Sequence, residues 1–348
     1  MTPLQAFTKG YSKSKELILQ GKVSDVEKNL LKARKKYMIS QSFADKKYYD
    51  GIKKALNKER PMHSIKEPLF DIDEREVKHC VVSPSLYESF GKDFVEKYNL
   101  VDLSNHPDIG RVGYEVPCVY FGCYKDLDIA RISRNRSDFK IIVYGGTDAT
   151  RFSSLKRLRN IKGLNHVAIS SYVSKDLDKM RINHKLIPIT PVDHSKFDFF
   201  PEKKGDTVYI YNCSPSKAAK YGKALYEKVI KRLSKTHPQI KFSICGYKTY
   251  DRQGLIDVYK NSFIGLRLID HDGLPNTVIE LGLMGRRVVH NGGLPSGIPY
   301  SSVDDVCEAI VSEYNNRDVI EYDLSIETRE YLENSTAWLK REYWEDES

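Results

Sequence analysis

Two carboxylates lie in one short segment that suits a ligand with phosphate and hydroxyl groups. Asp272 precedes an apolar helical pattern, and Glu280 lies one turn inside it. Gly273 removes side-chain bulk where a ligand would touch the backbone, and Pro275 suits the first turn of a helix that begins near Asn276. The free N–H groups and positive dipole end of that helix favour phosphate oxygens. Both carboxylates can accept hydrogen bonds from hydroxyls, so the segment predicts a ligand with both kinds of group.

A second interpretation of these residues needs no ligand. In it, Asp272 caps the helix and Glu280 is a solvated helix residue. In both interpretations Gly285 ends the helix before the buried run Val288–Val289. The surrounding pattern has to decide between them.

Short apolar runs alternate with helical patterns over most of the chain, which is typical of parallel strands covered by helices. The first series of strand-like runs is 77–83, 116–122, 139–146, 166–171 and 185–190. The second is 206–213, 240–246, 262–268 and 286–291, with helices expected near 216–235, 253–261, 275–285 and 302–315. A polar, proline-marked stretch at 191–206 separates the series. The sequence therefore predicts two doubly wound units, with functional residues in the loops that follow the strands.

The segment 272–289 resembles the large family of retaining GT-B glycosyltransferases that includes sucrose and glycogen synthases. The hallmark of that family is an acid, Gly, any residue, Pro and Asn, then a second acid, Gly and a Val-Val strand. The chain has Asp272, Gly273, Pro275, Asn276, Glu280, Gly285, Val288 and Val289 at the matching positions. The resemblance implies an α/β fold of GT-B type, in which two Rossmann-like domains face a cleft, here with an amino-terminal helical extension.

Four segments are expected on this basis. Residues 1–75 form a basic helical extension, and 76–192 form the amino-terminal Rossmann-like domain, which holds the acceptor. Residues 193–325 form the carboxyl-terminal Rossmann-like domain, which holds the nucleotide-sugar donor. Residues 326–348 form a carboxyl-terminal helix that crosses back to the first domain.

The resemblance also implies roles for single residues of the donor site. The first acid and the adjacent backbone amides hold the transferred sugar and the phosphates, and the second acid holds the ribose. These roles fall on Asp272, as a catalytic residue, and on Glu280. The other donor-binding residues in this segment are Gly273, Leu274, Pro275, Asn276 and Thr277.

Upstream, the chain departs from the family's pattern. An Arg and, five residues later, a Lys neutralise the diphosphate in the family, and here Asn212 and Lys217 occupy those positions. Lys220 lies close enough to substitute, and Gly246 lies in a loop similar to the one beside the nucleotide base. A second departure is Asp272, because the first acid is usually Glu. These differences leave the donor sugar and base open, with UDP- and GDP-sugars as the leading possibilities.

The first domain offers one further candidate. Asp148 follows two glycines after the strongest strand, and we predict that it approaches the acceptor hydroxyl or the donor from the opposite wall as a second catalytic residue. Stabilisation of the turn is the alternative role for this side chain. The family generally lacks an enzymic nucleophile, so the resemblance implies front-face attack assisted by the departing diphosphate, with retention of configuration.

Positive charge is concentrated at the amino terminus. Residues 1–60 hold fifteen Lys and Arg against six Asp and Glu, and the whole chain has a net charge of +9. This segment is either a solvated helical face or a surface for anions. Two alternative functions follow from this charge: a DNA-modifying glycosyltransferase, and a membrane-surface transferase for a lipid-linked acceptor. A third alternative, a non-catalytic nucleotide-sugar-binding module, follows from Asn212 at the position where the family has Arg.

Composition excludes several other classes. The 348 residues are 40% hydrophobic and 30% charged, which is globular composition. The chain has no long apolar span and no apolar signal region, so we expect a cytoplasmic protein, with peripheral membrane contact as an alternative. The six scattered cysteines suit reduced core thiols. We expect no metal and no cofactor, because neither a metal-ligand spacing nor a Gly-rich phosphate or dinucleotide loop is present.

Overall fold

The computed structural model describes most of the chain from residue 75 onward and parts of the amino-terminal segment. The described residues are 3–20, 25, 29, 32–33, 48–50, 75–106, 109, 114–195, 197–200, 203–212, 214–246 and 250–345. The chain divides into two compact units, Met1–Glu67 and Pro68–Ser348. In the first unit α1 (Pro3–Leu19) is an α-helix. The rest of the basic helical extension predicted for residues 1–75 lies largely outside the described residues.

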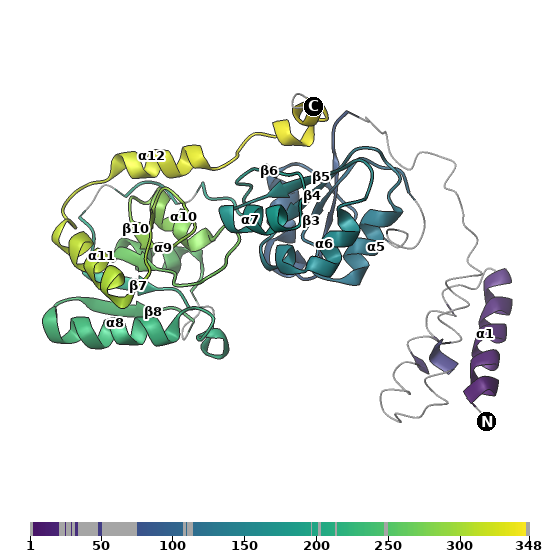
Figure 1. Ribbon diagram of the computed structural model, residues 1–348, viewed down its shortest axis with the longest axis horizontal. Coiled ribbons are helices and arrows are strands. Elements are labelled where there is room, and N and C mark those ends of the chain that lie inside the picture. Colours follow the sequence, from purple (N-terminus) through teal and green to yellow (C-terminus); the bar gives the residue numbers. More distant parts are fainter. Residues whose placement is uncertain are drawn as a thin grey trace. The chain divides into compact units, whose positions relative to one another are not determined.

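A parallel sheet forms the first half of the second unit (Figure 1). In the described part of the chain its strand order is β2-β1-β3-β4-β5-β6, and every neighbouring pair is parallel. The strands are β1 (His79–Val82), β2 (Val101–Asp102), β3 (Cys118–Phe121), β4 (Lys140–Tyr144), β5 (Leu164–Ala168) and β6 (Lys185–Leu186). The helical segments are η1 (Tyr87–Gly91), α4 (Lys92–Lys97), α5 (Asp126–Arg134), η2 (Thr147–Thr150), α6 (Phe152–Leu158) and α7 (Ser171–Lys179).

A second parallel sheet follows, with the order β11-β10-β9-β7-β8 among the described strands. Its strands are β7 (Thr207–Ile210), β8 (Lys241–Ile244), β9 (Ser262–Leu266), β10 (Arg287–Val289) and β11 (Gly297–Ile298). Its helical segments are η3 (Pro215–Lys217), α8 (Lys223–Thr236), α9 (Arg252–Lys260), α10 (Asn276–Leu283) and α11 (Val303–Asn315). The two doubly wound units predicted from the alternating pattern are therefore present.

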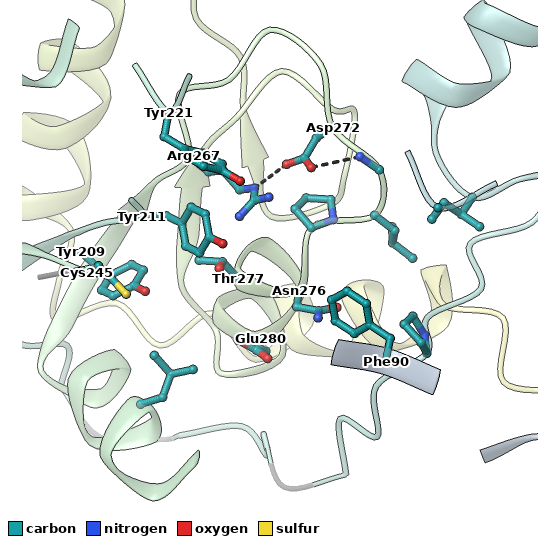
Figure 2. Close-up of a pocket in the computed structure, with 18 of the residues that line it drawn as sticks. Phe90, Tyr209, Tyr211, Tyr221, Cys245, Arg267, Asp272, Asn276, Thr277 and Glu280 are labelled. Atoms are coloured by element: carbon teal, nitrogen blue, oxygen red, sulfur yellow. Dashed lines mark hydrogen bonds and ion pairs between the residues drawn. The ribbon is translucent and has the colours of Figure 1, made fainter. Parts of the chain in front are cut away.

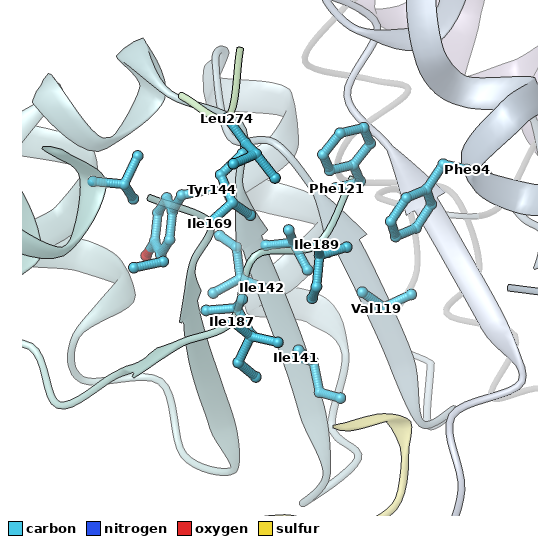
Figure 3. Close-up of a cluster of buried hydrophobic side chains, with 14 of the residues drawn as sticks. Phe94, Val119, Phe121, Ile141, Ile142, Tyr144, Ile169, Ile187, Ile189 and Leu274 are labelled. Carbon is cyan, nitrogen blue, oxygen red and sulfur yellow. The ribbon is translucent and has the colours of Figure 1, made fainter. Parts of the chain in front are cut away.

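The first sheet has a continuous apolar core because its central strands are buried along their whole length. Figure 3 shows this core around Ile141 and Ile142 of β4, with Phe121 of β3 beside it. Residues 272–275, which precede the helix predicted to begin at Asn276, form the predicted donor loop of the second domain. Leu274 of this loop packs near Tyr144 and is 9% exposed. The donor loop is thus anchored on the core of the first domain.

The carboxyl-terminal segment runs from the second domain to the first (Figure 1). Helix α12 (Tyr322–Tyr331) packs on α10, where the Ser325 hydroxyl donates to the carbonyl of Leu283. Further on, Trp338 is fully buried against Tyr98 of the first domain. Two short segments, η4 (Ala337–Leu339) and α13 (Glu342–Glu345), end the described chain. The single helix predicted for 326–348 is therefore divided into shorter pieces.

Three elements differ from the sequence prediction for a clear reason. Strands β2 and β11 have only two residues each, so they leave no apolar run in the sequence. The helix predicted over 216–235 is interrupted because Gly222 has a φ of +74°, which a right-handed helix does not accommodate. A short 3₁₀ turn at Pro215–Lys217 precedes that glycine, and α8 follows it.

Candidate functional site

A cavity of about 570 Å³ lies between the two sheets of the second unit (Figure 2). Several of its lining residues come directly after a strand: Gly145 after β4, Ile169 after β5, Tyr211 after β7, Cys245 after β8 and Arg267 after β9. Ligands of open parallel sheets bind outside these carboxyl ends. The volume also falls within the range of small-molecule sites.

The predicted donor loop forms one side of this cavity. Residues Asp272–Thr277 and Glu280 line it, and α10 begins at Asn276 as the sequence predicts. The carbonyl of Pro275 accepts the amides of Val278 and Ile279 at 3.0 and 3.2 Å. The preceding amides in this first turn have no partner within the helix and are available to phosphate oxygens.

Two backbones touch at the edge of the cavity. A Cβ atom on Gly273 would lie 2.5 Å from the carbonyl oxygen of Gly145, and one on Gly146 would lie 3.2 Å from the amide nitrogen of Gly273. Only glycine permits this approach between the donor loop and the loop after β4. Gly273 therefore brings the two domains together as well as exposing backbone to a ligand.

Further contacts fix the donor loop against the first domain. The hydroxyl of Ser170 donates to the carbonyl of Asp272 at 3.3 Å, and that of Ser171 donates to the carbonyl of Gly292 at 2.9 Å. His271 Nε2 lies 2.7 Å from the carboxylate of Asp176 on α7. The loop thus has a defined position relative to α7.

Asp272, at the start of the donor loop, forms an ion pair with Arg267. The Nε of Arg267 pairs with one carboxylate oxygen of Asp272, and the other oxygen accepts the amide of Gly273 at 3.0 Å (Figure 2). The guanidinium lies over the ring of Tyr211, 4.2 Å from its centroid, and 5.6 Å from that of Tyr221. Burial acts to lower the pKa of Arg267, but the Asp272 carboxylate raises it by more. The net effect is a raised pKa, so the guanidinium stays charged.

Glu280 lies deeper in the cavity, on α10. Its side chain is buried, and the hydroxyl of Tyr259 donates to its Oε2 at 2.8 Å. Burial raises the pKa of Glu280 to about 7, against the opposing effect of the Tyr259 hydrogen bond. The interpretation of Glu280 as a solvated helix residue is wrong, because the residue is 7% exposed and faces the cavity. Tyr209 and Cys245 also line the cavity (Figure 2).

Three of the predicted donor-binding residues do not line the cavity. Lys217 and Lys220 are exposed, on and after the 3₁₀ turn that follows β7. Asn212 is fully buried, and neither of its side-chain polar atoms has a partner among the described residues. Gly246 does line the cavity, and a Cβ atom on it would lie 1.9 Å from the backbone oxygen of Asn212. Direct donor binding by the two lysines and Asn212 stays a prediction.

Asp148 is also held away from the cavity. Its carboxylate is buried and accepts the amides of Cys123 at 3.0 Å, Gly145 at 3.2 Å and Gly146 at 2.8 Å. Burial raises its pKa, although these amides oppose the shift. The geometry favours the alternative in which Asp148 stabilises the loop after β4, and its predicted catalytic role is untested.

Several lining residues were not predicted from the sequence. On the second domain they include Arg267 and a group of tyrosines, Tyr209, Tyr211, Tyr221, Tyr250 and Tyr259. On the first domain they are apolar: Leu86, Phe90, Phe121, Ile169 and Pro191. Arg267 left a signal, since it is the charged residue that ends the otherwise apolar run SFIGL. The apolar residues left none, because they match the pattern of core residues.

In the described part of the chain, no group of three or more His, Cys, Asp or Glu side chains is placed to hold a metal ion. The described cysteines, which exclude Cys213, are all free thiols. None of the described helices has the length and apolar character that crossing a bilayer requires.

Comparison with known proteins gives structural matches. No protein-family model matches the chain, and no curated protein matches it in sequence. A glycosyltransferase from Rickettsia africae ESF-5 has a similar structure, with a TM-score of 0.53 and 13% identity over 77% of this chain and 90% of that one. The α/β fold of GT-B type, with two Rossmann-like domains, is thereby confirmed.

Two further structures match less well. TarM from S. aureus, solved with UDP, Fondaparinux and α-GlcNAc-glycerol, has a TM-score of 0.44 and 14% identity over 65% of this chain and 54% of its own. Sucrose-phosphate synthase from Thermosynechococcus elongatus has a TM-score of 0.44 and 13% identity over 73% of this chain and 75% of its own. The chain spans about half the length of TarM.

Proposed function

We propose that this chain is a glycosyltransferase that moves a sugar from a nucleoside-diphosphate sugar to an acceptor hydroxyl. The observation that carries the proposal is the position of the donor loop. It brings the Asp272 carboxylate and the amino terminus of α10 to one side of the interdomain cavity, with Glu280 deeper inside. The fold shared with the Rickettsia africae glycosyltransferase supports the same class of reaction.

Each part of such a donor has a matching group in the cavity. The phosphates fit the amino terminus of α10, where backbone amides and the helix dipole favour anions. The ribose hydroxyls fit Glu280, which can accept hydrogen bonds beside the Tyr259 hydroxyl. The base fits the space near Cys245, Gly246 and Tyr250. The transferred sugar then lies at Asp272.

Retention of configuration is part of the proposal. Both carboxylates of the cavity are already engaged, Asp272 by Arg267 and Glu280 by Tyr259, so neither is placed as a free nucleophile. In front-face attack the acceptor oxygen bonds to the anomeric carbon as the bond to the diphosphate breaks. The departing phosphate oxygen takes the acceptor proton. The protein contributes position and charge stabilisation, and NMR of the first-formed product would reveal its anomeric configuration.

We propose that the reaction needs neither a metal nor a cofactor. The α10 amides and the nearby positive charge can stabilise the departing diphosphate without a divalent ion. Transfer measured with and without an excess of EDTA should then proceed at the same rate. A rate that falls with EDTA and returns with Mg²⁺ or Mn²⁺ would contradict this part of the proposal.

The donor site is tested by thermal-shift measurements with UDP-, GDP-, ADP- and dTDP-sugars. A ligand at a hundred times its Kd stabilises the folded chain by about 2.7 kcal/mol, which is a readily measured shift in Tm. We expect one nucleotide series to raise the Tm, and Glu280→Ala to reduce that rise. If no nucleotide or nucleotide sugar shifts the Tm, the proposed function fails.

The alternative of a non-catalytic binding module was motivated by the missing Arg at position 212. Arg267 weakens that motive, because it places a guanidinium in the cavity by another route. Slow donor hydrolysis that disappears in Glu280→Ala would exclude the module. For the acceptor, salt-dependent DNA binding or binding to anionic vesicles, each lost on deletion of residues 1–60, would separate the nucleic-acid and lipid alternatives.

A further inference from the structure

Arg267 is the cationic side chain among the described residues that line the cavity. In the same set Asp272 and Glu280 carry the negative charge. The lysines predicted for the diphosphate, Lys217 and Lys220, are exposed and lie outside the lining. Of the described lining residues, Arg267 therefore offers the positive charge to a diphosphate in the cavity.

The surroundings of Arg267 hold that guanidinium in a fixed orientation. Its side chain is 9% exposed, and its Nε is bound by Asp272, whose side chain is 14% exposed. The Tyr211 ring lies against the guanidinium plane, and Tyr221 packs edge-on against Tyr211 with ring centroids 5.0 Å apart. Rotation of a stacked, ion-paired fork costs more than rotation of a solvated one, so Arg267 is preorganised.

The pairing with Asp272 uses only part of the donor capacity of Arg267. A guanidinium carries five N–H donors in one plane, and Asp272 binds at Nε. Asp272 also fixes the start of the donor loop through the Gly273 amide. The same carboxylate thus ties the guanidinium to the loop that leads into the amino terminus of α10.

We propose that Arg267 is the residue that binds the diphosphate of the donor, and that Asp272 positions it for this contact. The inference rests on the proposed function, since it assigns one group of the donor to one side chain. It also accounts for two departures from the pattern of the resembling family. Arg267, just after β9, supplies the charge that Asn212 lacks, and the shorter carboxylate of Asp272 pairs with Arg267.

The test compares nucleoside diphosphate with the matching nucleoside, using the base that shifts the Tm of the wild-type chain. Isothermal titration with both ligands, and with pyrophosphate alone, is applied to the wild type, Arg267→Met and Arg267→Lys. Loss of a charge-assisted contact should weaken diphosphate binding about 100-fold in Arg267→Met. Nucleoside binding should change less than about threefold. Arg267→Lys keeps the charge but loses the fork and the stacking, so about a tenfold loss is expected.

A matched control is available on β10. Arg287 also pairs through Nε with a carboxylate, that of Glu321 at 2.8 Å, but it does not line the cavity. Arg287→Met should bind the diphosphate as the wild type does. Because Arg267→Met leaves a partly buried Asp272 unpaired, the double variant Arg267→Met/Asp272→Asn serves as a second test that removes both charges. It should show the same loss while keeping the wild-type Tm without ligand.

Each remaining outcome separates this inference from the proposed function. Wild-type diphosphate affinity in both Arg267→Met and the double variant overturns the role of Arg267 and leaves the donor proposal intact. If the wild type binds pyrophosphate as tightly as the nucleoside diphosphate, and Arg267→Met loses both, Arg267 is an anion ligand and the nucleoside part of the proposed function fails. If the wild type binds none of these ligands, both proposals fail.

Discussion

The two walls of the cavity have different chemistry. The second-domain wall holds its charged side chains, Arg267, Asp272 and Glu280, together with the tyrosines and the start of α10. The first-domain wall is formed by Leu86, Phe90, Phe121, Gly145, Ile169 and Pro191. Figure 2 shows Phe90 on the side of the cavity away from Tyr211 and Arg267.

This difference indicates how each wall recognises its ligand. Charges and hydrogen-bonding groups select a ligand by its functional groups, so the second-domain wall suits a donor with phosphates and hydroxyls. An apolar wall selects by shape and by apolar area. We therefore expect an acceptor that places an apolar surface next to the reacting hydroxyl. Four substitutions test this division, and they follow in order of decreasing effect.

Gly273→Ala breaks the contact between the walls. The new Cβ atom would lie 2.5 Å from the carbonyl oxygen of Gly145, so one backbone has to move. Because a displacement of about 1 Å can cost about 100-fold in rate, we expect sugar transfer to fall by about that factor, measured as kcat/KM. Ser170→Ala is the control, since it removes a hydroxyl contact to the same loop without adding bulk. Equal losses in the two variants would contradict a steric cause.

Asp272→Asn separates binding of the diphosphate from transfer of the sugar. The amide no longer offers a charged acceptor to a sugar hydroxyl, so transfer should fall about 50-fold. Nucleoside diphosphate lacks the transferred sugar, and the amide oxygen of the variant can still accept a hydrogen bond from Arg267 Nε and so keep its position. The diphosphate Kd should therefore stay within about threefold of the wild-type value. Asp304→Asn, at an exposed ion pair with Arg232, is the matched control. A large loss of diphosphate affinity with unchanged kcat would contradict the proposed contact between Asp272 and the transferred sugar.

Glu280→Gln sharpens the role of the deeper carboxylate. Above a pKa of about 7 the wild-type side chain is charged and accepts hydrogen bonds strongly, so nucleotide affinity should rise from pH 6 to pH 8. The glutamine variant should lack this rise and bind about tenfold more weakly at pH 8. Titrations at both pH values check the prediction. A parallel pH dependence in both proteins would exclude Glu280 as its source.

Glu280→Gln should weaken nucleotide binding at pH 8 but raise the stability of the ligand-free chain at that pH. Burial raises the pKa of Glu280 from 4.5 to about 7, so the folded chain holds a proton that the unfolded chain has released between these values. Its contribution to stability is present below pH 4.5 and is lost as the pH rises through 7. Without ligand, Glu280→Gln should therefore be more stable than the wild type at pH 8, by up to about 3 kcal/mol, and not at pH 4.5. Denaturation at the two pH values measures this difference.

Phe90→Ala probes the apolar wall. It shortens an apolar side chain on the first-domain side and leaves the charged wall untouched, so the donor Kd should not change. The ratio of transfer to donor hydrolysis should fall about fivefold, which corresponds to the loss of a partly buried apolar contact. Phe152→Ala, on α6 and 47% exposed, is the matched control. A changed donor Kd with an unchanged ratio of transfer to hydrolysis would show that Phe90 contacts the donor, and would contradict the assignment of the first-domain wall to the acceptor.

The two walls also differ in how far the sequence predicted them. The loop before α10 was predicted to line a ligand site because its acids, Gly and Pro match the pattern of the resembling family, and α10 begins at the expected Asn276. The first-domain wall was not predicted, since Phe121 and Ile169 occupy strand ends where burial in the core is the ordinary outcome. Side chains at the end of a buried strand face either the core or a ligand, and periodicity does not distinguish these.

Arg267 was not predicted, for a related reason. The alternating pattern assigned SFIGLRL to a buried strand, although its Arg lies just after β9 ends at Leu266. Lys217 and Lys220 owe their predicted diphosphate role to the family resemblance, and the path of their loop was not part of that prediction. Gly222 turns the chain before α8 begins, and both lysines lie exposed on the turn that precedes it. The alternation of strands and helices was predictable, whereas loop paths depend on single backbone conformations.

The two chain crossings between the domains have a mechanical consequence. One crossing lies between β6 and β7, and the other between α12 and the buried Trp338. They are joined to each other, because the amide of Glu333 donates to the carbonyl of Pro188 at 3.2 Å. Connections that lie together at one place are the arrangement of a hinge. We therefore expect any opening of the cavity to be a rotation about this place, which moves the donor loop away from Gly145.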